Sequence, residues 1–195
     1  MKSKGDLTKE KILKVATRLV HKNGIGDTSI NDLISATGLK KGSLYFHFQS
    51  KDALILAIME KTRAGFVKFL DSALSGETPG ESLDNFLERV LEKHRSAGFV
   101  GGCIFGNTAL EVSDKDKRFS SFVKDVFAEW IEKIREVVVA AQISGQVRND
   151  IPTSALACHI VSSIEGGIML ARLRKNEEPL KDCLNSIKTM IGLKT

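Results

Sequence analysis

The stretch TSINDLISATGLKKGSLYFHFQSKDAL, residues 28–54, decides the fold predicted for this chain. Ser29 opens a short apolar helical pattern, and Asp32 follows three residues later, which is the spacing of a capping box. Gly38 ends that pattern, and a second short helix is predicted over roughly residues 41–46. Two short helices joined by a tight, glycine-containing turn predict a helix-turn-helix, whose second helix enters the major groove of DNA.

The second short helix divides into an inward and an outward side. We predict that Leu44, Phe46 and Phe48 pack inward and hold the helix onto its neighbours. Hydroxyl and ammonium groups hydrogen-bond phosphates, and a glycine allows backbone to come close to the duplex. The candidate DNA contacts on the outward side are Lys41, Gly42, Ser43, Tyr45 and His47.

Two further candidates flank this unit. Thr28 and Lys51 stand at predicted helix starts, where backbone N–H groups favour phosphate. Of all these residues, Lys41 and Ser43 are predicted to read base edges, and Gly42 could contribute through close approach.

Positive charge is concentrated in the same part of the chain. Residues 1–51 hold ten Lys or Arg and four Asp or Glu, whereas the other 144 residues hold 19 basic and 20 acidic residues. A localised basic region is the footprint expected for a polyanion partner such as DNA. On charge alone, a solvated surface is an equally good interpretation.

The rest of the chain also carries the helical period, so we predict an all-α fold. A helix-turn-helix domain of residues 1–50 would precede a larger ligand-binding and dimerisation domain of residues 51–195. Its first helix would start at about Lys9, capped by Thr8. Later helices are expected near residues 52–74, 80–97, 103–112, 116–144, 153–174 and 179–191.

Composition favours a cytoplasmic protein without a metal or cofactor. The three cysteines are widely spaced and form no CxxC pair, so zinc and disulfide frameworks are not expected. No apolar segment follows the basic N-terminus and no run of about 18 apolar residues occurs, so neither a secretory signal nor a membrane span is expected.

The residues of the opening stretch resemble the DNA-binding domain of TetR-family transcriptional repressors. The shared pattern is a small residue and Gly38, then Lys41-Gly42-Ser43-Leu44-Tyr45, Phe48, Lys51 and Leu54, and the resemblance covers about residues 8–56. It implies phosphate contacts by Thr28, Tyr45 and Lys51. It further implies a homodimer on a roughly palindromic double-stranded DNA operator and a small-molecule effector in the second domain.

The segment GGCIFGNTALEVSD, residues 101–114, resembles a branch of that family with a Gly-Cys-x-x-Gly-Asn-x-Ala-x-Glu segment. Asn107 and Glu111 lie four residues apart on one helix face, where they could bind a ligand or, as we favour, join helices. The lone acid Glu165 is expected to pair with Arg172 or to lie at an interface edge. The candidate ligand-binding residues are Cys103, Asn107, Glu111, Phe127, Trp130, Glu165 and Met169.

The hypothesis from sequence is therefore a ligand-responsive DNA-binding regulator, most simply a repressor released from DNA by a small molecule. We do not expect an enzyme, because no nucleophile elbow and no acid pair stands out. Two alternatives stay open at this point. One is a carrier or enzyme whose first helices only resemble a DNA-binding unit, and the other is a protein-binding adaptor.

Overall fold

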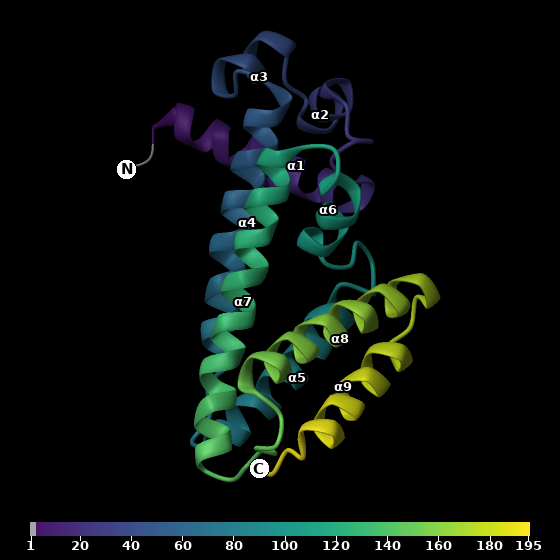
Figure 1. Cartoon of the computed structure of the whole chain (residues 1–195). Helices are drawn as coiled ribbons and strands as arrows, with labels where there is room; N and C mark the ends of the chain where they lie inside the picture. Colours follow the sequence, from purple (N-terminus) through teal and green to yellow (C-terminus); the bar gives the residue numbers. More distant parts are fainter. Residues whose placement is uncertain (1–2) are drawn as a thin grey trace.

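The computed structural model describes residues 3–195, and in that range it is built of α-helices without strands (Figure 1). The predicted all-α fold is confirmed. The helices are α1 (Lys4–Asn23), α2 (Ile30–Thr37), α3 (Lys41–His47), α4 (Lys51–Ala73), α5 (Pro79–Ser96), α6 (Ile104–Val112), α7 (Lys117–Ile143), α8 (Thr153–Arg174) and α9 (Glu178–Ile191).

Local capping chemistry sets the ends of the first helices. The predicted capping box of α2 is present, with the Ser29 side chain accepting from the Asp32 N–H. Gly38 ends that helix at φ 68°, a left-handed conformation that suits glycine. The predicted start of the first helix was wrong: Ser3 and Asp6 form a second capping box, so α1 begins at Lys4 and Thr8 lies inside it.

One hydrophobic core joins the helix-turn-helix to the rest of the chain. It takes Ile12, Leu33 and Leu44 from α1–α3 and Ile58 from α4, and it continues into Phe105 of α6. Helix α4 then runs on beside α7 (Figure 1). Because the core crosses residue 50, no gap in packing marks the predicted domain boundary, which stays a prediction.

A second core fills the far end of the molecule. There α5, α7, α8 and α9 pack together around residues such as Phe86, Ile134 and Ile164. Helix α8 is long and apolar enough to span a membrane by length and composition. Its side chains Ile160, Ile164 and others are instead buried against α7 and α9, as in the central helix of a globular core.

The two neighbouring glycines of α8, Gly166 and Gly167, have different surroundings. A Cβ on Gly167 would lie 3.0 Å from Cys183 Cβ, so this glycine allows α9 of the same chain to approach α8. A Cβ on Gly166 would meet nothing within 4 Å. Gly167 therefore serves packing within the chain, whereas Gly166 faces open space.

Candidate functional site: the DNA-binding helix and the internal cavities

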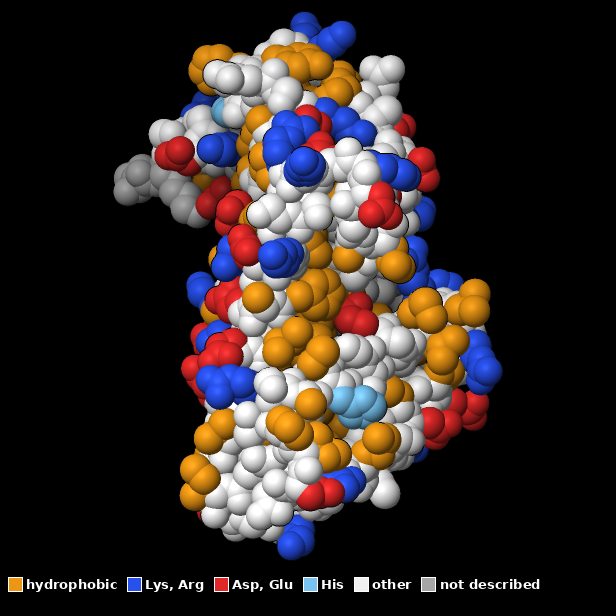
Figure 2. All heavy atoms as spheres, viewed as in Figure 1, with side chains coloured by type: hydrophobic (Ala, Val, Ile, Leu, Met, Phe, Trp, Pro, Cys, Tyr) orange, Lys and Arg blue, Asp and Glu red, His pale blue; other side chains and the backbone are white. Residues whose placement is uncertain are grey.

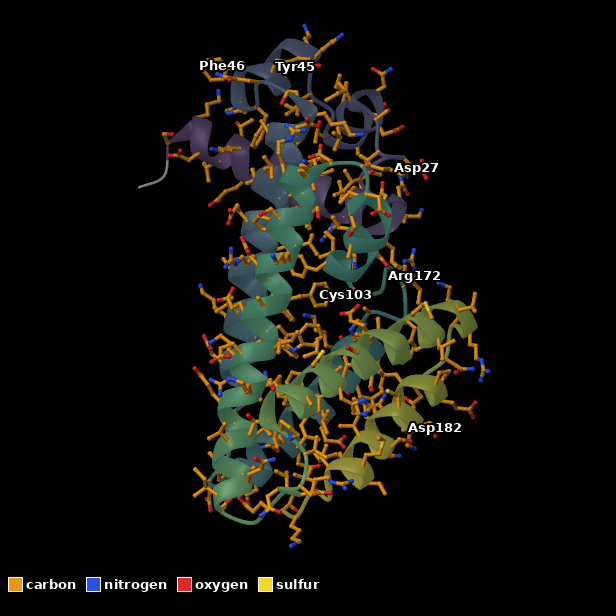
Figure 3. All side chains as sticks on the ribbon, viewed as in Figure 1. Asp27, Tyr45, Phe46, Cys103, Arg172 and Asp182 are labelled. Carbon is orange, nitrogen blue, oxygen red and sulfur yellow. The ribbon has the colours of Figure 1, made fainter. Side chains whose placement is uncertain are left out.

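Helix α3 lies at one end of the molecule and presents most of the predicted DNA contacts to solvent. Figure 3 shows Tyr45 at this end, and Tyr45 is 37% exposed. Lys41 and Gly42 are also exposed, while Ser43 and His47 are half-buried. Leu44 and Phe48 are buried as predicted. Lys and Arg side chains gather over this end of the molecule in Figure 2.

The prediction that Phe46 packs inward was wrong. Its side chain is 83% exposed, and its ring makes a T-shaped contact with His47, at 5.2 Å between centroids. A helix turns about 100° per residue, so Leu44 and Phe48, four residues apart, share one face. Phe46 lies about 200° from Leu44 and therefore points to the opposite side, with the candidate DNA contacts.

Gly42 is not required by packing within the chain. A Cβ at this position would meet nothing within 4 Å, and the residue lies in the first turn of α3. Glycine destabilises a helix relative to alanine, so its presence where neither packing nor backbone conformation requires it calls for another reason. The open space above Gly42 is therefore available to a molecule that approaches from outside.

The two flanking candidates differ in position. Lys51 is half-buried and its ammonium donates to the carbonyl oxygen of Gly26 at 3.2 Å. Thr28 has no exposed surface, and its hydroxyl donates to the carbonyl oxygen of Gly24 at 2.6 Å. The phosphate contact of Thr28 stays a prediction; in this structure its hydroxyl closes the turn before α2.

An internal cavity of about 340 Å³ lies between the two ends of the molecule. It is walled mainly by aromatic and aliphatic side chains, and the ring of Trp130 meets Phe66 edge-on at 5.2 Å between centroids. Its lining includes Thr17, His21, Thr62, Phe66, Phe69, Lys93, His94, Cys103, Phe105, Trp130 and Glu165. This volume is within the range of small-molecule sites.

A second cavity of about 500 Å³ adjoins the first and shares Gly102, Cys103, Glu165 and Ile168 with it. Figure 2 shows hydrophobic side chains gathered where α7 passes α8, and Figure 3 shows Cys103 between α6 and α8. The two cavities bring together six of the seven predicted ligand-binding residues: Cys103, Asn107, Phe127, Trp130, Glu165 and Met169.

Glu111 is the predicted ligand-binding residue that lines neither cavity. Its carboxylate accepts hydrogen bonds from the backbone N–H groups of Ile25, at 3.0 Å, and Gly26. Asn107 also joins helices, because its amide donates to the Gly101 carbonyl and accepts from Arg172 at 2.8 Å. The favoured structural role fits both residues.

Of the two alternatives for Glu165, the pairing with Arg172 is not found, and that guanidinium instead donates to Asn107. Burial raises the pKa of Glu165 to about 6, and a hydrogen bond with Cys103 opposes that rise. Burial also raises the pKa of the Cys103 thiol well above its usual range, so the sulfur stays protonated and is a poor nucleophile.

Two histidines near the cavity had no recognisable signal in the sequence. Burial lowers the pKa of His94 to about 4, helped by the charges of Lys93 and His21. The His21 ring nitrogen Nε2 lies 2.9 Å from the carbonyl oxygen of Gly102. Among residues 3–195, no group of three His, Cys, Asp or Glu side chains is arranged to hold a metal ion.

Comparisons with known proteins bear on both ends of the molecule. Residues 12–58 match the family model described as bacterial regulatory proteins, tetR family. Residues 79–187 match the model described as tetracyclin repressor-like, C-terminal domain.

Individual relatives match over nearly the whole chain. An HTH-type transcriptional regulator in the lacX 3′ region of Lactococcus lactis subsp. lactis is 30% identical, over 93% of this chain and 92% of that protein. The HTH-type transcriptional repressor DhaR of Mycobacterium sp. (strain GP1) is 23% identical, over 92% and 89%. A crystal structure of a TetR transcriptional regulator from Chloroflexus aurantiacus J-10-FL has a TM-score of 0.89 at 32% identity, covering 97% of this chain and 96% of that one.

Proposed function

Because this chain belongs to the TetR family of bacterial regulatory proteins, with a DNA-binding N-terminus and a ligand-binding C-terminus, we propose that it is a repressor released from its operator by a small molecule. The observation that carries the proposal is the double attachment of α6. The loop just before this helix lines both cavities through Gly102 and Cys103. The C-terminal end of α6 holds the DNA-binding domain through Glu111.

The DNA end of the proposal rests on α3. Lys41, Gly42, Ser43, Tyr45 and His47 are the proposed contacts on this helix, with Lys51 beside it. Hydroxyl and ammonium groups at these positions suit phosphate, which positions a helix in the groove without reading sequence. Phe46 joins this set because of its exposure, and an apolar ring can contact a thymine methyl group.

The link between ligand and DNA runs through two contacts. His21 of α1 lines the first cavity and its ring lies 2.9 Å from the carbonyl oxygen of Gly102. A Cβ on the neighbouring Gly101 would lie 2.6 Å from the same ring, so the loop is closely packed on α1. A ligand that shifts this loop therefore moves α1 and, through Glu111, the turn before α2. The ligand lowers DNA affinity by its preference for the shifted state.

The dimeric form of the proposal rests on exposed apolar side chains near the end of α8. Met169, Leu170 and Leu173 are 55%, 41% and 77% exposed, and Met190 of α9 is 51% exposed. Apolar groups gathered on one face favour burial against another protein surface. A second copy placed there would give the two α3 helices that a palindromic operator requires.

The same proposal includes repression and a cytoplasmic location. It also includes membership of the branch with the Gly-Cys-x-x-Gly-Asn segment. The relative DhaR carries repression in its name, and the relatives are bacterial transcriptional regulators. The segment itself forms α6 and the loop before it, which is where the proposed coupling lies.

Genomic footprinting of the purified protein, with and without extract of the source cells, tests the proposal. We expect protection of a short palindromic sequence that the extract abolishes. Salt must be held constant, because phosphate contacts make DNA affinity steeply salt-dependent. Absence of any protected sequence, together with turnover of a small molecule, would instead favour the alternative of an enzyme or carrier.

A further inference from the structure

Two buried polar atoms in the wall of the first cavity have no hydrogen-bond partner. These atoms are Trp130 Nε1 and Glu165 Oε1. Among residues 3–195, they are the buried side-chain nitrogen and oxygen atoms that lack a hydrogen-bond partner. Trp130 is only 3% exposed. An unsatisfied buried polar atom is unfavourable, and each one in a folded protein calls for an explanation.

Three neighbouring polar side chains of the cavity wall are already engaged within the chain. The hydroxyls of Thr17 and Thr62 donate to the carbonyl oxygens of Leu13 and Ile58. His21 lies against the carbonyl oxygen of Gly102. The Trp130 indole N–H and the Glu165 carboxylate oxygen are therefore the buried donor and the buried acceptor left to a ligand in this cavity, beside Lys93 and His94, which also line it.

The position of the Glu165 carboxylate is set by close packing on α6. A Cβ on Gly106 would overlap Oε2 of Glu165, so only glycine at that position lets the carboxylate lie there. One carboxylate oxygen is thus held against the α6 backbone, and the other lacks a partner. A carboxylate fixed in this way selects ligands by the position of a hydrogen-bond donor.

The cavity wall carries one group of each charge, so neither an anion nor a cation is favoured by both of them. An anion would meet the Glu165 carboxylate, which is buried among apolar groups. A cation would meet Lys93, whose ammonium lies 4.3 Å from the centroid of Phe69 and 5.4 Å from that of Phe66, both of which line the cavity. The aromatic wall itself suits a flat ring system.

We propose that the effector is an uncharged molecule built on aromatic or similar flat rings, with an acceptor for Trp130 Nε1–H and a donor for Glu165 Oε1. This inference rests on the proposed function only in calling the ligand an effector. Its hydrogen-bonding requirement follows from the cavity wall and can be tested without DNA.

The test uses four naphthalene probes of similar size: the diol with a hydroxyl on each ring, its dimethoxy derivative, naphthoate and naphthylmethylammonium. Calorimetry gives their affinities for the full chain. We expect the diol to bind about tenfold or more tightly than each of the other three, because only the diol can both donate and accept without a charge. Equal or tighter binding of any other probe, or no binding of the diol, would overturn the proposal.

Trp130 supplies a second and independent readout, since it is the only Trp in the chain. Isotopically labelled protein therefore shows one indole N–H signal, which we expect the diol to move downfield as it accepts the hydrogen bond. An unmoved signal at saturating diol would contradict the proposed contact even if the diol binds.

Two variants assign the contacts. Trp130→Phe keeps a ring but removes the donor, and Glu165→Gln keeps the shape but removes the charge. Each should weaken the diol about tenfold. The naphthylmethylammonium probe, which has no acceptor, should be less affected by Trp130→Phe, and the dimethoxy probe, which has no donor, should be less affected by Glu165→Gln. Asp125→Asn, an exposed acid on α7, is the matched control and should change no affinity. A diol affinity unchanged in both cavity variants would overturn the assignment.

Failure of this inference and failure of the proposed function give different results. If operator binding is found but the diol shows no preference, the regulator stands and the ligand class is wrong. If the diol is preferred but no operator exists, the cavity takes this ligand class for a purpose other than regulation.

Discussion

Glu111 Oε2, near the end of α6, lies 3.0 Å from the backbone nitrogen of Ile25, in the turn between α1 and α2. The same carboxylate accepts from Gly26, and a Cβ on Gly24 or Gly26 would come too close to it. A single side chain of the ligand-binding half thus fixes the turn that leads into the helix-turn-helix. Mutation of Glu111 therefore tests whether the two halves of the molecule are coupled through this contact.

The first prediction concerns this contact. Glu111→Gln replaces one acceptor by an amide donor that faces a backbone N–H, so we expect a loss of about 1–3 kcal/mol of stability. If the contact transmits the ligand signal, the effector-induced fall in operator affinity should shrink. Measurement requires operator affinity with and without effector at constant salt. Asp125→Asn serves as control, and an unaltered ligand response in Glu111→Gln would exclude the contact from the signal.

The second prediction separates folding from DNA binding at Gly42. Gly42→Ala should leave stability unchanged or raise it by up to about 1 kcal/mol, because alanine favours the helix and the added Cβ meets nothing. Operator affinity should nevertheless fall, because the methyl group stands between α3 and DNA. Gly65→Ala, at another open helical position in α4 and in the wall of the first cavity, should match the stability effect and, measured without effector, should not lower operator affinity.

The third prediction contrasts two neighbouring phenylalanines of the opening stretch. Phe48 is 6% exposed and Phe46 is 83% exposed. Phe48→Ala should therefore cost about 3–5 kcal/mol of unfolding free energy, whereas Phe46→Ala should stay within about 0.5 kcal/mol of the native value. Denaturant unfolding of both variants measures this difference. Similar losses in the two variants would contradict the orientation of α3 described above.

The fourth prediction follows from the raised pKa of Glu165. The folded protein binds a proton here with a pKa of about 6, compared with 4.5 for an unperturbed Glu. The folded state therefore holds the proton more tightly, and stability falls as pH rises from about 4.5 to 6 and stays lower above that. Glu165→Gln should remove this part of the pH dependence and gain up to about 2 kcal/mol at neutral pH. Unfolding curves across this pH range, compared with those of Asp125→Asn, test the effect.

Much of the fold could be predicted from local patterns. Helical periodicity and capping residues placed α2 and α8 almost to the residue, because the Ser29–Asp32 box and Pro152 act within one helical turn. Capping residues could not predict the start of α1, because Ser3 and Thr8 are both residue types that favour the N-cap position. The turn of 100° per residue predicts that Phe46 points outward. The inward prediction followed instead from the hydrophobicity of its side chain.

The candidate site was predictable only in part, because its contacts join distant segments. Cys103, Trp130 and Glu165 stood out as unusual residues in apolar helices, and they do line the first cavity. The partnership of Glu111 with Ile25 spans 86 residues, and that of His21 with Gly102 spans 81. No periodicity or spacing in the sequence reports such contacts, which depend on how α6 packs over α1.

The central claim is that α3 binds DNA, and Tyr45→Phe tests it most directly. This change removes one hydroxyl from a half-exposed ring, so folding should be preserved. At constant salt, operator affinity should fall several-fold and by a similar factor for operator variants, as expected for loss of one phosphate contact. Unchanged operator affinity in Tyr45→Phe and in Lys51→Ala, with both proteins folded, would contradict the account.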